Sequence, residues 1–203
     1  MRKQIGLFFG SFNPIHIGHL ILANHLAEHS ALHEVWLVVT PQNPFKEKQS
    51  LLDNHLRLEM AELAVDDYPK LRTCNIEFHL PQPNYTVNTL AHLGEKYPDV
   101  DFALIMGEDN LKSFHKWKNY EHILSNYQLY IYPRISEGVV AEVLSNHPHI
   151  TRIAAPIIEL SATFIRDEIK ARHNVRPLLP EKVWQYIDKM LTQIGRASCR
   201  ERV

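Results

Sequence analysis

The stretch that most constrains how this chain folds is a short apolar run near its start, followed by a polar turn and an amphipathic segment. The apolar run, residues 5–9, predicts a buried strand, and the pattern of residues 20–27 predicts a helix. Gly10 and Ser11 in the turn are small enough for a phosphate to approach the backbone closely. The first N–H groups of the helix, near Gly18, carry the positive end of its dipole. The stretch therefore predicts a phosphate-binding turn between a strand and a helix.

Two histidines in this turn add chemistry to it. His16 and His19 are three residues apart, so both imidazoles can face one ligand and donate hydrogen bonds to phosphate oxygens. Helix capping, core packing or a zinc pair are the alternative roles. The pattern His-Ile-Gly-His after Gly-Ser-Phe-Asn-Pro resembles the nucleotidyltransferase superfamily, which includes adenylyltransferases, cytidylyltransferases and class I aminoacyl-tRNA synthetases. In that superfamily the histidines stabilise a pentacovalent α-phosphate, and the enzyme supplies no nucleophile.

The resemblance implies roles for the rest of the turn. Gly10, Ser11 and Phe12 would contact ATP, and Ser11 and Phe12 would also contact the second substrate. His16 and His19 would be catalytic, with His19 bound to ATP as well.

A second signature lies far along the chain. Ser161 is a predicted helix N-cap, and a hydroxyl beside the free N–H groups of a helix start binds phosphate oxygens well. Arg166 lies about one and a half turns further on and can reach back as a fixed positive charge. An ordinary capped helix is the alternative. The run from Ser161 to Arg166 resembles the family's Ser-[Ser/Ala]-Thr-x-[Ile/Leu]-Arg signature, which implies that Ser161, Thr163 and Arg166 bind ATP and that Arg166 is catalytic.

Two further apolar runs, residues 34–40 and 100–106, predict buried strands. A strand, a helix and a strand with short links indicate a parallel sheet, and ligands bind at the carboxyl edge of such sheets. At that edge, Gly107 allows close backbone approach, and Asp109 either accepts hydrogen bonds from a ribose or caps the next helix. A resemblance to the family's Met-Gly-Ala-Asp-Asn segment favours ribose binding by Asp109, with Gly107 beside the ATP. The implied fold is α/β, a Rossmann-like parallel sheet with helices on both faces and a small C-terminal helical portion.

Three segments resemble one branch of the superfamily, the bacterial nicotinate mononucleotide adenylyltransferases. Residues 85–90 resemble the segment whose first threonine, here Thr86, offers its amide to the pyridine carboxylate; residues 114–120 resemble the segment whose tryptophan, here Trp117, stacks on the ring. Lys46 stands at the family's lysine position, although the histidine before it is replaced by phenylalanine. From the residues themselves, a helix cap, a core tryptophan and a solvated lysine are the alternatives. The resemblance implies that Lys46 is catalytic and that Lys46, Thr86 and Trp117 bind the mononucleotide.

The implied reaction joins ATP and nicotinate mononucleotide into deamido-NAD and pyrophosphate. Mg²⁺ would accompany ATP, held mainly by phosphates and water, so no metal ligand is predicted in the protein. Phosphopantetheine adenylyltransferase shares the first turn and part of the second signature, and it is the nearest alternative enzyme. A non-catalytic nucleotide sensor is an alternative of another class, but it need not keep both histidines, Lys46 and Arg166.

Composition limits the cellular role. With 203 residues, 45% of them hydrophobic, and a formal charge of −1, the chain has enough apolar residues for a core and no charge excess that favours nucleic acid or an anionic membrane. It has no signal-peptide pattern, and its two cysteines, Cys74 and Cys199, show no pairing pattern, which predicts the cytoplasm. Residues 1–194 are predicted to form one domain, and residues 195–203 to be a vector-derived tail. The oligomeric state stays open, a homo-oligomer included.

Weaker patterns predict the remaining elements. A helix should begin at or near an N-cap at Asp53, with Arg57 and Glu59 on its solvated face. A strand is expected within residues 71–78, a helix from about residue 85 to 96 and a strand over 127–132. A short helix over 138–145, a short strand over 150–154 and a closing helix over 183–191 complete the prediction.

Overall fold

The structure is a computed structural model, which describes residues 2–42, 51–135 and 140–200. Within these ranges six strands form one parallel sheet in the order β3-β2-β1-β4-β5-β6. The chain order of neighbouring strands reverses between β1 and β4, which places a crevice outside the carboxyl ends of these two strands. The strands are β1 (Lys3–Gly10), β2 (Glu34–Val39), β3 (Leu71–Cys74), β4 (Val100–Gly107), β5 (Gln128–Tyr132) and β6 (Ile150–Arg152).

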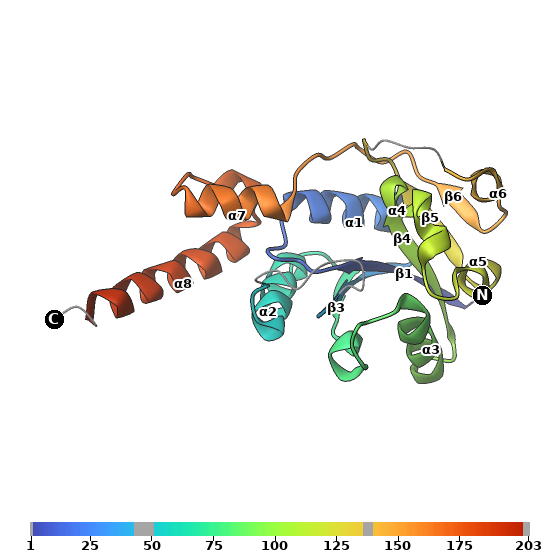
Figure 1. Ribbon diagram of the computed structural model, residues 1–203, viewed down its shortest axis with the longest axis horizontal. Coiled ribbons are helices and arrows are strands. Elements are labelled where there is room, and N and C mark those ends of the chain that lie inside the picture. The colour runs from blue at the N-terminus through green and yellow to red at the C-terminus, as the bar shows by residue number, and fades with distance from the viewer. Residues whose placement is uncertain (1, 43–50, 136–139, 201–203) are drawn as a thin grey trace.

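Helices cover both faces of the sheet, because each parallel pair of strands needs a crossover connection. Figure 1 shows α1 and α3 on opposite sides of the strands, with α7 and α8 together at one end of the molecule. The helices are α1 (Ile17–His29), α2 (Asn54–Val65), α3 (Thr86–Lys96), α4 (Glu108–Lys112), α5 (Tyr120–Asn126), α6 (Glu142–Ser145), α7 (Ala162–Lys170) and α8 (Glu181–Arg200). Short 3₁₀ helices lie at Ile76–His79, Phe114–Lys116 and Arg176–Leu178.

Alternate residues of the central strands enter two separate apolar cores. On β4, Ala103 and Ile105 pack in the core that contains α1 and α2, whereas Leu104 and Met106 pack in the core that contains α3 and α5. From Phe102 onward both faces of the strand are buried, and its sequence there is apolar. The predicted α/β fold, with helices on both faces and a small C-terminal helical portion, is confirmed.

The strand expected within residues 71–78 is present, but it ends at Cys74. The chain turns at Asn75 and continues as the 3₁₀ helix Ile76–His79. This turn buries the side chain of Glu77, whose carboxylate accepts a hydrogen bond of 2.7 Å from the Thr89 hydroxyl on α3. The alternating pattern did not reveal that this carboxylate would be buried and would accept a hydrogen bond from another helix.

The prediction that Arg57 faces solvent is wrong. Asp53 does cap α2, since its side chain accepts a hydrogen bond from the N–H of His55, and Glu59 is exposed as expected. Arg57, however, is completely buried beneath the ends of β1 and β2, where backbone carbonyls accept its hydrogen bonds.

The C-terminal part departs from the prediction in the length of its helices. The described part of the predicted helix 138–145 is α6, Glu142–Ser145, and α8 extends past residue 191 to Arg200. The division into a domain of residues 1–194 and a tail of 195–203 stays a prediction. None of the helices in the described ranges combines the length and the apolar composition that a membrane span requires.

Candidate active site

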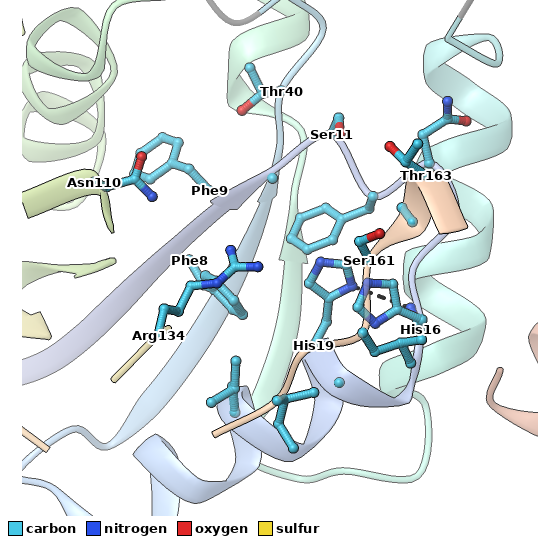
Figure 2. Close-up of a pocket in the computed structure, with 18 of the residues that line it drawn as sticks. Phe8, Phe9, Ser11, His16, His19, Thr40, Asn110, Arg134, Ser161 and Thr163 are labelled. Carbon is cyan, nitrogen blue, oxygen red and sulfur yellow. Dashed lines mark hydrogen bonds between the residues drawn. The ribbon is translucent and has the colours of Figure 1, made fainter. Parts of the chain in front are cut away.

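A cleft of about 740 Å³ opens at the carboxyl edge of the sheet. Its lining comes from the end of β1 and the turn after it, the start of α1, the segment after β2, the start of α4, the end of β5 and the residues around the start of α7. The two sequence signatures therefore meet at one cleft, and Figure 2 shows Ser161 and Thr163 facing the histidine pair.

His19, in the first turn of α1, has its ring orientation fixed by the backbone. Its Nδ1 accepts a hydrogen bond of 3.3 Å from the N–H of His16, the dashed line in Figure 2. A neutral imidazole that accepts at Nδ1 carries its proton on Nε2. The ring is stacked on His16, with centroids 3.7 Å apart, and Phe12 packs edge-on against it at 5.1 Å. The ring of His19 is thus held in place by two neighbouring rings and a backbone hydrogen bond.

His16 is almost completely buried beside it. Burial, assisted by the positive charge of Arg134, lowers the pKa of His16 to about 4, so the ring is neutral at physiological pH. As the N-cap residue of α1, His16 accepts a hydrogen bond of 3.0 Å at its carbonyl from the N–H of His19. Its Nδ1 has no hydrogen-bond partner within the described part of the chain. His16 can therefore orient His19 and share a proton with a ligand, but it supplies no charge.

The second signature forms the facing wall. Ser161 caps α7 as predicted, accepting a hydrogen bond of 3.1 Å from the N–H of Phe164. Arg166 donates from Nη1 to the carbonyl of Asn13 at 2.8 Å and from Nη2 to the Thr163 hydroxyl at 3.1 Å. Arg166 thus joins the second signature to the turn that carries the first.

Asp109 lies at the start of α4, directly after β4. Its Oδ2 is 3.8 Å from Nη1 of Arg134, while its Oδ1 is buried and has no hydrogen-bond donor among the described residues. A buried acceptor without a donor is unusual and suits a ligand hydroxyl. A Cβ atom at Gly107 would collide with the Asp109 carboxylate, so Gly107 allows this carboxylate to approach the backbone closely.

Thr86 and Trp117 do not line this cleft, but their segments adjoin it and each other. Gln42, which does line the cleft, accepts a hydrogen bond of 3.1 Å at its carbonyl from the N–H of Asn84, and its own N–H donates to the Asn84 side chain at 3.3 Å. Nζ of Lys118 lies 4.5 Å from the centre of the Tyr85 ring. Lys118, next to Trp117, is therefore in contact with Tyr85, next to Thr86.

The ring of Trp117 packs against Phe114, with centroids 5.4 Å apart at 60°. It is half-buried at the edge of the core that contains α3, so the structure supports its packing role directly. Lys46 lies outside the described residues.

Arg134 is the site residue that sequence reasoning missed. It follows β5 by two residues and lines the cleft. Its guanidinium pairs with Asp109, and its positive charge helps to lower the pKa of His16. The rule that ligands bind at the carboxyl edge of parallel strands was applied to β1, β2 and β4, and applying it to β5 would have found Arg134.

Comparison with known proteins agrees with the class that this geometry defines. Residues 7–168 match the family model described as cytidylyltransferase-like, so fold, signatures and family match together define a nucleotidyltransferase. A solved structure, Plasmodium falciparum nicotinic acid mononucleotide adenylyltransferase complexed with NaAD, has a TM-score of 0.76 with this chain. It is 20% identical and covers 93% of this chain and 96% of its own, a likeness that shows the fold.

Closer relatives define the branch. A protein of Christiangramia forsetii named "Probable nicotinate-nucleotide adenylyltransferase" is 66% identical over 190 residues, which cover 94% of this chain and 98% of the relative. A protein of Flavobacterium psychrophilum with the same name is 62% identical, covering 91% of this chain and 96% of the relative. This chain belongs to the nicotinate-nucleotide adenylyltransferase family, and the resemblance found in its sequence is confirmed.

Proposed function

We propose that this chain transfers the adenylyl group of ATP to nicotinate mononucleotide, giving deamido-NAD and pyrophosphate. The observation that carries the proposal is the meeting of the two signatures at one cleft. His19 lies on one wall, and Ser161 and Thr163 lie on the other. The names of the relatives at 66% and 62% identity support the same reaction.

The phosphate of the mononucleotide is already an anion, so it can attack the α-phosphorus of ATP without a general base. One P–O bond forms to the mononucleotide phosphate, and the bond to the β-phosphate breaks as pyrophosphate leaves. Catalysis then depends on positioning and on stabilising the charge of the transition state. We assign the Nε2–H of His19 to the oxygens around the α-phosphorus, since the bond from the His16 N–H to Nδ1 of His19 supports that tautomer.

Cationic side chains stabilise the rest of the triphosphate. Arg166 is assigned to the β- and γ-phosphates, with Ser161 and Thr163 at their distal end, because all three adjoin the turn of the first signature. Arg134 adds a second guanidinium to the cleft, and Lys46 is assigned to both substrates on the resemblance alone. The carboxylate of Asp109 is assigned to the ATP ribose, since its Oδ1 lacks a donor from the described residues.

The pyridine ring is assigned to the start of α3. The N-cap residue Tyr85 makes no side-chain capping bond, which leaves the first N–H groups of α3, beginning at Thr86, without that partner. An anionic carboxylate is favoured there by both the free donors and the helix dipole. A half-buried Trp117 on the adjoining segment offers a flat apolar surface for the ring.

Magnesium bound to the triphosphate would neutralise charge on the departing pyrophosphate. Asp109 is the one carboxylate among the described residues that line the cleft, and it is paired with Arg134. This donor set suits an ion held mainly by phosphates and water rather than by a cage of protein ligands.

The test is pyrophosphate release with ATP and Mg²⁺, using nicotinate mononucleotide, nicotinamide mononucleotide and phosphopantetheine in parallel. Turnover that strongly favours the nicotinate compound supports both the reaction and an anion-selective ring site. Turnover with phosphopantetheine instead would replace the proposed acceptor. No turnover from folded protein that binds ATP would favour a nucleotide sensor. The cytoplasmic location and the oligomeric state stay predictions.

A further inference from the structure

Arg57, on the first turn of α2, is the largest fully buried side chain in the described part of the protein. Its exposed fraction is 0%. A guanidinium is costly to remove from water unless its N–H groups find partners. The position of those partners therefore shows what the side chain is used for.

The guanidinium donates to three backbone carbonyls and one side-chain amide. Nη1 donates to the carbonyl of Ser11 and, at 3.0 Å, to the carbonyl of Thr40. Nε donates to the carbonyl of Leu52 at 3.1 Å, and Nη2 to Oδ1 of Asn54 at 2.6 Å. The planar fork thus joins three segments: the turn after β1, the end of β2 and the start of α2.

The bond to Ser11 fixes a strained peptide. The next residue, Phe12, has φ of 45°, a left-handed conformation that a bulky side chain rarely adopts. The peptide between Ser11 and Phe12 is trans, so the N–H of Phe12 points away from the carbonyl that Arg57 holds. Both residues line the cleft. In this orientation the Phe12 N–H is available to an anion on the side of the turn opposite Arg57.

Further bonds hold the turn. The N–H of Thr40 donates to the carbonyl of Gly10 at 2.9 Å, so the ends of β1 and β2 are already joined by a backbone hydrogen bond. Arg57 adds hydrogen bonds to the residues at both of these ends. Two residues after Ser11, the carbonyl of Asn13 accepts the hydrogen bond from Arg166. One arginine therefore holds the turn from beneath and another from the cleft.

The charge of Arg57 is not neutralised by a bonded carboxylate, because its four acceptors are carbonyl and amide oxygens. Burial lowers the pKa of Arg57 and the nearby Asp53 raises it, but a guanidinium stays protonated across the physiological range. The turn consequently has a positive charge on the side of the Ser11 carbonyl and the Phe12 N–H on the opposite side, which is a favourable arrangement for phosphate.

We propose that Arg57 is a positioning residue for adenylyl transfer: it never touches the substrates, and it holds the Ser11–Phe12 peptide and the Thr40 carbonyl in the geometry that the phosphates require. The inference rests on the proposed function, since it supposes that the phosphates bind at this turn. It assigns a functional role to a residue whose sequence pattern predicted solvent exposure.

The test compares Arg57→Lys with Met60→Ala. Lysine keeps the charge but cannot hold both carbonyls with a planar fork. Met60 is a fully buried residue of the same helix that lies in the apolar core, so its truncation destabilises α2 without touching the turn. For Arg57→Lys we expect kcat to fall about tenfold or more, because the Ser11–Phe12 peptide is no longer held in place. For Met60→Ala, kcat per folded molecule should stay within about twofold of the parent at a similar loss of Tm.

The role is overturned if folded Arg57→Lys keeps kcat within about twofold of the parent. It is also overturned if the kcat of Met60→Ala falls by as large a factor as that of Arg57→Lys. Should Arg57→Lys not fold, Asn54→Ala decides, because it keeps Arg57 and removes the acceptor of Nη2. A kcat reduced at least about threefold supports the proposal, and an unchanged kcat rejects it.

A binding readout separates this inference from the proposed reaction. The rise in Tm caused by pyrophosphate should be smaller in Arg57→Lys than in the parent and unchanged in Met60→Ala. If the parent does not turn over nicotinate mononucleotide, the proposed function fails, yet the pyrophosphate comparison still tests Arg57. An equal Tm rise in Arg57→Lys and the parent would contradict the role in phosphate positioning.

Discussion

Lowering the pH should unfold this protein in a way that depends on one buried histidine. His16 must be neutral in the folded state, because burial and Arg134 lower its pKa to about 4 from an ordinary value of 6.5. In the unfolded chain the ring titrates near 6.5. Above that pH both states hold the neutral ring, so this group adds no pH dependence.

Between pH 6.5 and about 4 the unfolded state binds a proton that the folded state does not. The free energy of unfolding must therefore fall as the pH falls through this window. A shift of about 2.5 units, at about 1.4 kcal/mol per unit, gives a loss of up to about 3 kcal/mol from His16.

The assay is urea denaturation at several pH values between 7 and 4.5, comparing the parent with His16→Gln. The variant lacks the titrating ring, so its stability should fall less steeply, and the difference between the two proteins isolates His16 from the carboxylates that titrate in the same range. His92→Gln, at an exposed position on α3, is the matched control and should follow the parent curve. Parallel curves for the parent and His16→Gln across the window would refute the reasoning.

Three further predictions concern the site. His19→Ala should lower kcat about a hundred- to a thousandfold with little change in Tm, measured by pyrophosphate release, because a charge-stabilising donor is lost; a variant that keeps most of its kcat would remove His19 from this role. Trp117→Ala should raise the mononucleotide KM while the ATP KM barely moves, and steady-state kinetics with each substrate varied would reject ring stacking if both KM values rose equally. Ser161→Ala should lower the free energy of unfolding by about 1 kcal/mol, because the hydrogen bond from the Phe164 N–H to the cap is lost; urea denaturation of unchanged midpoint would contradict this.

The sheet could be predicted because its strands carry their own signal. The central strands β1, β2 and β4 are apolar on both faces, so each reads as a continuous run, and their ends were placed within about two residues of the observed ones. The two signatures likewise predicted that His19 and Arg166 would approach the same ligand, and the structure brings both to one cleft. Their catalytic roles stay predictions.

The predictions that failed concern charged residues whose hydrogen-bond partners are distant in sequence. Amphipathic patterns count a charged residue as exposed, yet Arg57 is buried because its acceptors at Ser11 and Thr40 lie 46 and 17 residues away. The strand expected within residues 71–78 ends early for the same reason. Glu77 is buried, and the Thr89 hydroxyl on α3 donates a hydrogen bond to its carboxylate. No periodicity in a segment can reveal a polar partner that only the finished fold supplies.

The hydrogen bond between Arg166 and the carbonyl of Asn13 spans 153 positions of the chain. During synthesis from the N-terminus, the turn that receives this bond exists long before the residue that makes it. A nascent chain therefore lacks the wall of the cleft that residues around the start of α7 form until this helix has been made. Contacts of such long range also slow folding, because a large loop must close before the contact is made. We therefore expect the protein to acquire catalytic competence only after α7 has been made and has docked against this turn.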